Sequence, residues 1–429
     1  MATQTSLSPG ANTALTPLPD AQRLFGWREH ASLWLSLGVG LLVMQIGAYL
    51  VPALGTKAAA LVIVLGSVLG AGLLAWTAKI GCDSGLSSAG LMHATYGSSF
   101  ARLPVLLNIV QLVGWTTFEL VVMRDGTLAM ARQGGGFQGA PWTLATTLLW
   151  GAVIIALMAG SMVTLVRKFI GRYGLPLVMA SLVWLTWQFL LKANAQGLSA
   201  LWNRPGEGGM GMLSALDLVI AMPVSWLPLV ADFSRHGRDG KGALRGTWLG
   251  YAVANIWCYA LGVLVTLTTP SADLVAALLV AQGGLIALSL ILIDEVDNAY
   301  GDVYSGAVAG HSMLPRWSIR QWGVGMAVVC TALATVLPMH SLEPFLLMLS
   351  SVFVPLYGVI LARLGNASNV ANLVSARKVN PSAVGIWFTG IACYHLCAQF
   401  APDFGSALPS LALTFTLAAL TRNAGRSAQ

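Results

Sequence analysis

Long apolar runs dominate the chain, and short polar or basic segments separate them. Twelve runs of about 18 to 24 residues are each long enough to cross a bilayer as an α-helix. They lack the alternation of apolar and polar residues that membrane β-strands show, so each run predicts a helix. We therefore expect an all-α polytopic membrane protein with spans near 31–54, 57–78, 103–123, 142–164, 173–192, 212–233, 246–268, 274–298, 321–338, 342–362, 382–400 and 405–421.

Composition supports this class. Hydrophobic residues make up 56% of the 429 residues and charged residues only 9%, which excludes a soluble globular protein, where about 25% charged is usual. Residues 1–30 are polar and rich in turn formers, which predicts a cytoplasmic tail without a signal peptide. The five cysteines are scattered and show no disulfide or metal spacing, so we expect no cofactor.

Basic residues predict the orientation in the membrane. With the N-terminus placed inside, 18 of the 23 Lys and Arg residues fall on the cytoplasmic side. This asymmetry predicts a multi-pass protein of the inner or plasma membrane, with both termini cytoplasmic. The net charge of +7 is thus a topology signal, and no nucleic-acid partner is expected beside the lipid bilayer.

Two spans contain helix-breaking residues. Gly47 and Pro52 lie in the outer half of the first span, and Pro223 and Pro228 interrupt the sixth. Breaks in equivalent helices indicate an inverted repeat with a binding site at mid-membrane, although simple kinks remain an alternative. The expected organisation is a ten-helix core over 31–362 with repeats 31–192 and 212–362, then helices eleven and twelve over 363–421 and a cytoplasmic tail over 422–429.

The eighth span carries the strongest chemical signal. The stretch Leu288–Gly306 places Asp294, Glu295, Asp297 and Asp302 against an apolar segment. A carboxylate at bilayer depth is costly unless it faces a cavity, an ion or a partner, so such acids mark substrate, ion or proton sites. In the alternative interpretation the helix has already ended and the acids lie in water.

The third span presents polar and aromatic groups on one face. Gln111, Trp115 and Glu119 follow each other at intervals of four residues, which aligns an amide, an indole and a carboxylate. An indole can stack on a planar pyrimidine, and an amide or carboxylate can bind its polar edge. Trp115 could instead serve packing, and Glu119 could lie in water near the outer end of the span.

The sixth span offers a second aromatic group. Ser225 and Trp226 lie between the two prolines, where unwound backbone could bind a ligand and Trp226 could form a second stacking wall. Gln45 in the first span is a further polar candidate, for which helix packing is an equally good account.

Three short motifs carry a resemblance to a known family. They are Gln111-Leu-Val-Gly114-Trp115, the run from Ala231-Asp232-Phe233 to Arg238, and Asp297-Asn298-Ala299 followed by Tyr304-Ser305-Gly306. From about Arg23 to the tenth span the chain resembles the nucleobase:cation symporter-1 family, in particular its cytosine permease branch with proposed hydroxymethylpyrimidine carriers. The resemblance implies a ten-helix inverted-repeat core, a flat heterocycle held between spans one, three, six and eight, and coupling to Na⁺ or H⁺.

Residues and resemblance together define the expected site. The substrate-binding candidates are Gln45, Gly47, Gln111, Trp115, Glu119, Ser225, Trp226, Glu295 and Asn298. The ion-coupling candidates are Ala48, Asp294, Glu295 and Asp297.

The coupling ion is open at this stage. The segment Ile293–Asn298 lacks Ser and Thr, so the hydroxyl ligands that the family implies for Na⁺ are missing. A carboxylate could bind Na⁺ directly, carry a proton, or accept hydrogen bonds from a substrate amine.

The expected function is import of cytosine, hydroxymethylpyrimidine or a related heterocycle by a secondary active transporter. An amino-acid or amine symporter of the same fold is the alternative. No zinc-protease, nucleophile-elbow or P-loop motif supports an intramembrane enzyme.

Overall fold

The computed structural model describes residues 13–133, 135, 139–160, 173–269, 273–367 and 369–424. In these ranges the chain is almost entirely helical, and its strand-like pairing is an isolated parallel bridge between Phe25 and Gly237. Parts of the expected tails 1–30 and 422–429, and the end of the expected span 142–164, lie outside the described residues.

The helical elements follow one another along the chain in this order: η1 (Asp20–Gln22), α1 (Trp27–Ser36), α2 (Leu41–Leu50), α3 (Thr56–Ser84), α4 (Ser88–Tyr96), α5 (Arg102–Gln133), α6 (Ala140–Leu157), α8 (Leu175–Gln196), α9 (Leu198–Trp202), α10 (Met212–Ser225), α11 (Leu227–Ser234), α12 (Gly240–Thr268), α13 (Leu274–Leu279), α14 (Gly284–Met313), α15 (Ile319–Val336), α16 (Leu342–Leu364), η3 (Val370–Leu373), α17 (Pro381–Phe400), η4 (Pro402–Phe404) and α18 (Ala407–Ala424).

Twelve helical passes account for the described chain. Nine helices are long and apolar enough to cross a membrane, and α1 with α2 form a tenth pass that is bent by 64°. The remaining two passes are α14, which carries the cluster of acids, and α18, whose apolar part is Ala407–Thr421. The expected all-α membrane fold is therefore confirmed, with ten passes among the described residues that are long and apolar enough to cross a membrane.

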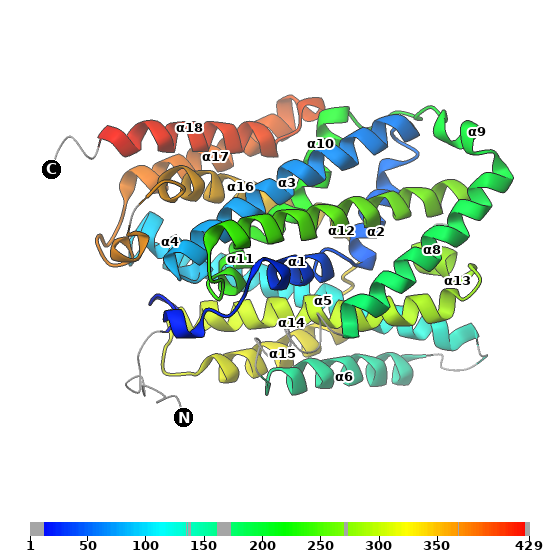
Figure 1. Cartoon of the computed structure of the whole chain (residues 1–429), viewed down its shortest axis with the longest axis horizontal. Helices are drawn as coiled ribbons and strands as arrows, with labels where there is room; N and C mark the ends of the chain where they lie inside the picture. Colours follow the sequence, from blue (N-terminus) through cyan, green and yellow to red (C-terminus); the bar gives the residue numbers. More distant parts are fainter. Residues whose placement is uncertain are drawn as a thin grey trace.

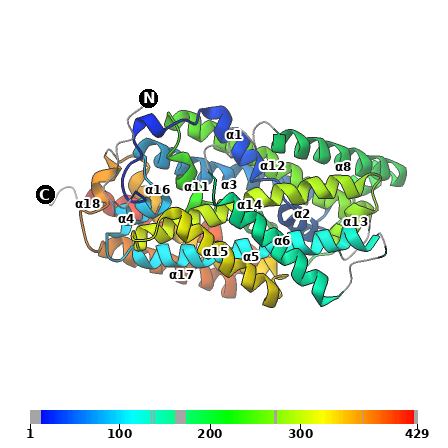
Figure 2. The same cartoon turned by 90° about the horizontal axis from the view of Figure 1, so that it is seen from below.

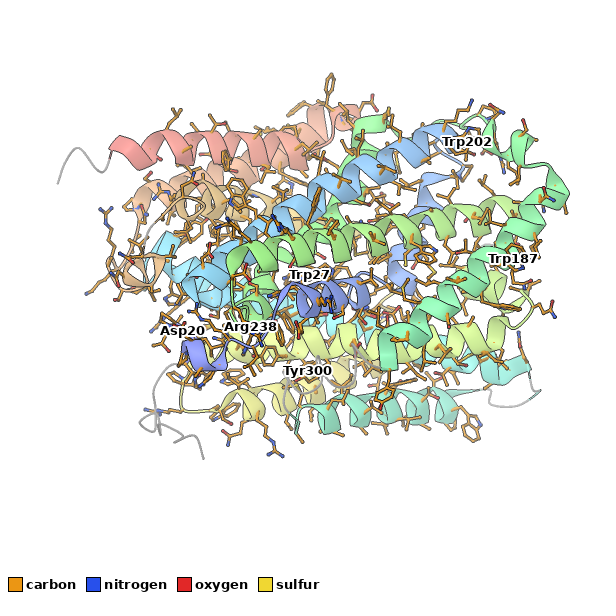
Figure 3. All side chains as sticks on the ribbon, in the orientation of Figure 1. Asp20, Trp27, Trp187, Trp202, Arg238 and Tyr300 are labelled. Carbon is orange, nitrogen blue, oxygen red and sulfur yellow. The ribbon has the colours of Figure 1, made fainter. Side chains whose placement is uncertain are left out.

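The long helices run along the longest axis of the molecule (Figure 1). The segment around η1 and the end of α18 lie at the same end in both cartoon views (Figures 1 and 2). We call this the terminal end. Exposed Trp187 and Trp202 lie toward the opposite end, whereas Asp20 and Arg238 lie near the terminal end (Figure 3). Exposed tryptophans are common where a membrane protein meets the lipid headgroups.

Helix packing divides the core into two groups. Helices α1, α2, α3, α10, α11 and α12 pack together, and we call them the bundle. Helices α5, α6, α14 and α15 form a second group, the scaffold, in which α5 and α14 make the largest contact. Helices α16, α17 and α18 pack on one another, and α16 also contacts α10. The interface between bundle and scaffold is where the broken helices lie.

The break in the first pass differs from the expected one. It spans residues 37–40, between α1 and α2, whereas Gly47 lies inside α2 and Pro52 follows its end. Gly38 packs so closely that a Cβ there would lie 2.7 Å from the Cβ of Ala254. Glycine has low helix propensity and permits such close approach, so the pass is broken by the two glycines at 38 and 40 and not by Pro52.

The interruption of the sixth pass is narrower than expected. Pro223 lies within α10, Pro228 lies in the first turn of α11, and only Trp226 separates the two helices. Its φ of −85° and ψ of −11° remain near helical values. Pro228 fits the first turn because the N–H groups there have no intrahelical partner. The expected break between the prolines is therefore confined to Trp226, and Ser225 is the last residue of α10.

The eighth pass has different bounds from the expected ones. The expected span 274–298 is divided into α13 and α14, and α14 continues to Met313. Gly283 separates the two with φ of +70°, a conformation that favours glycine. All four acids of the stretch 288–306 consequently lie inside one buried helix, so the interpretation that they lie in water beyond the helix was wrong.

Candidate functional site

A narrow cavity lies between the bundle and the scaffold. Its volume is about 20 Å³, room for roughly one water molecule. Helices α5 and α14 supply its polar wall, and the two broken passes supply the rest. The lining residues are Leu37, Gly40, Leu42, Val43, Trp115, Glu119, Met222, Ser225, Trp226, Leu229, Glu295, Asn298 and Asp302. The fold thus brings together Trp115, Glu119, Ser225, Trp226, Glu295 and Asn298 from three separate passes.

Glu295 connects α14 to the break in the first pass. Its carboxylate accepts the backbone N–H of Leu41 at 2.5 Å, and Asn298 donates to it at 3.0 Å. Leu41 is the first residue of α2, whose N-terminal N–H groups have no partner within the helix. The negative charge also complements the positive end of the helix dipole. Glu295 therefore caps a bundle helix from the scaffold.

Gly40 makes this contact possible. A Cβ at this position would lie 3.1 Å from Oε1 and 3.2 Å from Oε2 of Glu295. Any larger side chain would push the carboxylate away from the start of α2. Asn298 adds a second link, because its amide also donates to the carbonyl of Val39 at 3.2 Å.

Glu119 on α5 faces Glu295 across the cavity. Both side chains are at most 5% exposed. Both residues also line the cavity together with Asp302. Lys, Arg and His are absent from this lining. The cavity is thus acidic and rich in hydrogen-bond acceptors.

Two indoles lie at the same cavity. Trp115 packs against Phe345 of α16 with ring centroids 5.1 Å apart, and Trp226 meets Trp34 edge to face at 5.8 Å. The Nε1 of Trp115 is buried and has no hydrogen-bond partner among the described residues. Gly114 leaves room for Phe345, since a Cβ there would lie 2.7 Å from its ring. The Gly114-Trp115 pair therefore lets α16 close over the indole.

Asp294 and Asp297 form a second acidic pair, which does not line this cavity. Both carboxyl groups lie next to Ser36, the last residue of α1, at 3.0 and 3.2 Å from its Oγ. A hydroxyl group carries only one proton to donate. One of the two carboxyl groups must therefore either carry a proton itself or face the hydroxyl without a hydrogen bond.

Asp302 is the polar lining residue that the sequence interpretation did not assign to the site. It is 3% exposed, and its carboxylate makes no hydrogen bond or ion pair with any described residue. The run of small and apolar residues that continues to Gly310 was the signal that α14 extends past it.

Gln111 lies beside the cavity and does not line it. Its amide donates to Asn108, and Asn108 in turn donates to the carbonyl of Pro228 at 2.9 Å. This short chain of hydrogen bonds joins α5 of the scaffold to α11 of the bundle. Gln111 thus orients an interface contact in this conformation.

The candidates on α2 lie elsewhere. Gln45 donates to Tyr49 and, like Ala48, lines a wider cavity of about 630 Å³. This outer cavity includes Asp125, Arg132 and Asp273, and Leu42 lines both cavities. Gly47 instead packs against the backbone of Tyr259 on α12, which indicates close helix packing.

The motif from Ala231 to Arg238, which begins inside α11, connects several elements at the terminal end. Asp232 accepts the backbone N–H of Ser88 at the start of α4. Phe25 donates to the carbonyl of His236 and accepts from the N–H of Arg238, so the segment before α1 is tied to this loop. These contacts give the motif a structural role, and none of its residues lines the acidic cavity.

Metal binding by protein side chains alone is not indicated. Among the described residues, no group of three or more His, Cys, Asp or Glu is placed to hold a metal ion. A cation at Asp294 and Asp297 would need backbone carbonyls as additional ligands.

Comparisons with known proteins agree with this architecture. A family model described as "Permease for cytosine/purines, uracil, thiamine, allantoin" matches residues 17–419. Among curated proteins, none matches the chain in sequence.

Solved structures show the same fold at low sequence identity. Mhp1, a nucleobase-cation-symport-1 family transporter, in a closed conformation with bromovinylhydantoin bound, matches with a TM-score of 0.82 and 17% identity over 96% of each chain. The inward-facing conformation of Mhp1 matches with a TM-score of 0.74 and 17% identity, over 95% of this chain and 91% of that one. A Na⁺-coupled sialic acid symporter in a substrate-bound outward-open state matches with a TM-score of 0.65 and 11% identity, over 97% of this chain and 92% of that one.

The family model covers nearly the whole chain, including all the residues that line the acidic cavity. The protein therefore belongs to the nucleobase:cation symporter-1 family of membrane permeases.

Proposed function

We propose that this permease imports a pyrimidine-type nucleobase or a related amine-bearing heterocycle, such as cytosine or hydroxymethylpyrimidine, together with H⁺. One observation carries the proposal. Two indoles and three carboxyl groups surround a single cavity whose lining contains no basic side chain. Stacking suits a flat ring, at roughly 1 to 3 kcal/mol per base, and acceptor groups suit its amino edge.

The substrate specificity follows from the charges. Glu119, Glu295 and Asp302 can accept hydrogen bonds from exocyclic amines and protonated ring nitrogens. A substrate carboxylate would meet three acids and no cation, which disfavours an amino acid whose carboxylate enters this cavity. The Nε1 of Trp115 is buried without a hydrogen-bond partner among the described residues, and it can bind a carbonyl oxygen of the ring.

Alternating access explains the small volume of the cavity. A space for one water molecule cannot hold a heterocycle, so binding requires that the bundle and the scaffold separate. The outer cavity adjoins the site at Leu42 and provides the approach from the end opposite the termini. With both termini in the cytoplasm of a cell membrane, as the basic residues predict, this approach is extracellular.

Proton coupling is favoured over sodium coupling by the groups at the first break. Asp294 and Asp297 both lie at the hydroxyl of Ser36, which can donate to only one of them. A proton on either acid supplies the missing hydrogen bond, whereas a bound Na⁺ would need further oxygen ligands. Protonation of Glu295 would also weaken its bond to Leu41 N–H, because a neutral carboxyl is a poorer acceptor. Coupling through Glu295 and Asp294 thus connects the charge of α14 to the position of α2.

A binding screen tests the function. Purified protein is titrated with cytosine, hydroxymethylpyrimidine, uracil, hydantoin, purines and amino acids while tryptophan fluorescence is recorded. Quenching by amine-bearing pyrimidines, lost in Trp115→Ala, supports the proposal. Quenching by amino acids alone would show that the permease transports another substrate class.

A further inference from the structure

We infer that the hydrogen bond between the carboxylate of Asp232 on α11 and the backbone N–H of Ser88, the first residue of α4, is a latch that holds the terminal end closed. This end opens when the bond breaks. The inference rests on the alternating access of the proposed function, and it does not depend on which heterocycle is carried. It adds the contact that must break on the cytoplasmic side, where the proposed orientation puts both termini.

The latch crosses the interface that alternating access has to open. Helix α11 packs on α3 within the bundle, whereas α4 packs also on α5 and α14 of the scaffold. Asp232 accepts the N–H of Ser88 at 3.0 Å, and both residues are buried. This N–H lies in the first turn of α4 and has no partner within the helix. A charged acceptor at a helix start binds more strongly than a neutral one. A bundle side chain thus holds a helix that packs on the scaffold.

The chain before α1 fastens the same two elements. The carbonyl of Thr13 accepts a hydrogen bond at 3.3 Å from Arg235, which follows the last residue of α11. The next carbonyl, that of Ala14, accepts from the hydroxyl of Ser87, the N-cap residue of α4, at 2.5 Å. Two consecutive carbonyls therefore connect the end of α11 with the start of α4 beside the latch. Opening of the terminal end would have to release them as well.

The latch lies next to the part of α14 that leads away from the acidic cavity. Asp302 lines this cavity, and Ser305 follows it by one turn on the same face of α14. Tyr304 packs on Phe233 with ring centroids 5.5 Å apart, so this turn lies against the residue after Asp232. The Oγ of Ser305 is buried and has no hydrogen-bond partner among the described residues. A path that opens at the latch would let water reach this hydroxyl.

Thiol labelling at position 305 tests the latch. Ser305→Cys is placed in a background without the five native cysteines, and a membrane-impermeant thiol reagent is added to inside-out vesicles in the absence of substrate. Position 305 is fully buried, so the labelling rate reports how often the terminal end opens. Asp232→Ala should raise this rate about tenfold or more, the scale of one hydrogen bond to a charged group. An unchanged rate would overturn the inference.

Two substitutions of Ser88 form a matched pair. Ser88→Pro removes the N–H that Asp232 accepts, and proline is well tolerated at the first position of a helix. The extended backbone of Ser87, with ψ of 168°, is compatible with a following proline. Ser88→Ala keeps the N–H and removes only the hydroxyl. Ser88→Pro should therefore label about tenfold faster or more than Ser88→Ala, which should stay near the wild-type rate.

The double variant separates a latch from two independent defects. Asp232→Ala with Ser88→Pro should label within about twofold of the faster single variant, because both changes remove the same bond. Rates that multiply would overturn the latch, as would equal rates for Ser88→Pro and Ser88→Ala. Either position alone decides the question if the variant at the other fails to insert into the membrane.

The latch and the proposed function fail in different ways. Labelling is measured without substrate, so a negative result would leave the proposed transport of heterocycles intact. Failure of every heterocycle to quench tryptophan fluorescence in the binding screen would contradict the proposed function and leave the latch unaffected.

Discussion

The carboxylate of Glu295 accepts the backbone N–H of Leu41 at 2.5 Å, so a scaffold side chain caps the first helical residue of α2. The N-cap residue Gly40 has no side chain that could accept this N–H. The acceptor comes instead from Glu295, which lies 254 positions after Leu41 in the sequence. The bond crosses the interface that must open during transport. Movement of α2 relative to α14 therefore breaks or forms a charged hydrogen bond inside the membrane.

Gly40→Ala should destabilise the protein by about 1 kcal/mol, the usual cost of a lost helix cap. The added methyl group would displace the Glu295 carboxylate from Leu41 N–H. A thermal-shift assay in detergent measures the effect. Gly325→Ala is the control, because a Cβ there meets no atom within 4 Å. Equal melting temperatures for both variants would show that the cap contributes nothing.

Trp115→Ala should weaken substrate binding about 5- to 150-fold and abolish uptake at low substrate concentration, because one stacking face is lost. Trp142→Ala, which removes a tryptophan that is 44% exposed on α6, should leave uptake unchanged. Both variants are compared by radiolabelled uptake in cells at matched membrane expression. Near wild-type transport by Trp115→Ala would place the substrate elsewhere.

Ser225→Cys should react with a small thiol reagent and should be protected by bound substrate. Ser225 ends α10 and lines the acidic cavity, although it is only 6% exposed in this conformation. Labelling is measured in a background that lacks the partly exposed Cys393 and Cys397. Ser181→Cys on α8 is the control, and substrate should not change its labelling. Protection of both positions to the same degree would indicate a general conformational effect.

Uptake should fall as the external pH rises, because the protonated form of the coupling acids loads the carrier. Replacement of Na⁺ by choline should have no effect, and Glu295→Gln should remove the pH dependence. Uptake into vesicles with imposed pH and Na⁺ gradients measures all three. A strict Na⁺ requirement at constant pH would refute proton coupling. Unchanged coupled uptake in both Glu295→Gln and Asp294→Asn would remove α14 from the mechanism.

The number of passes and the acidic character of α14 could be predicted from sequence because both depend on local composition. A run of apolar residues determines whether a segment enters the bilayer, whatever its neighbours are. Likewise, Gln111, Trp115 and Glu119 share a helical face by periodicity alone.

Proline was a weaker guide to the breaks. It predicted an interruption in the sixth pass, and the structure has one at Trp226, but it misplaced the break in the first pass. Proline tolerates the first turn of a helix, as at Pro228, and glycine can end a helix when packing requires it. The close approach of Gly38 to Ala254 and of Gly40 to Glu295 could not be known without the neighbouring helices.

Sequence by itself determined the membrane class, the twelve passes and the types of residue available to the site. Tertiary structure alone decided which of them meet: Glu119 with Glu295, Ser36 with Asp294 and Asp297, and Asp302 with the cavity. It also placed Gln45, Gly47 and Ala48 away from the acids. The physical reason is that hydrophobicity acts on each segment separately, whereas contacts between helices depend on packing over hundreds of intervening residues.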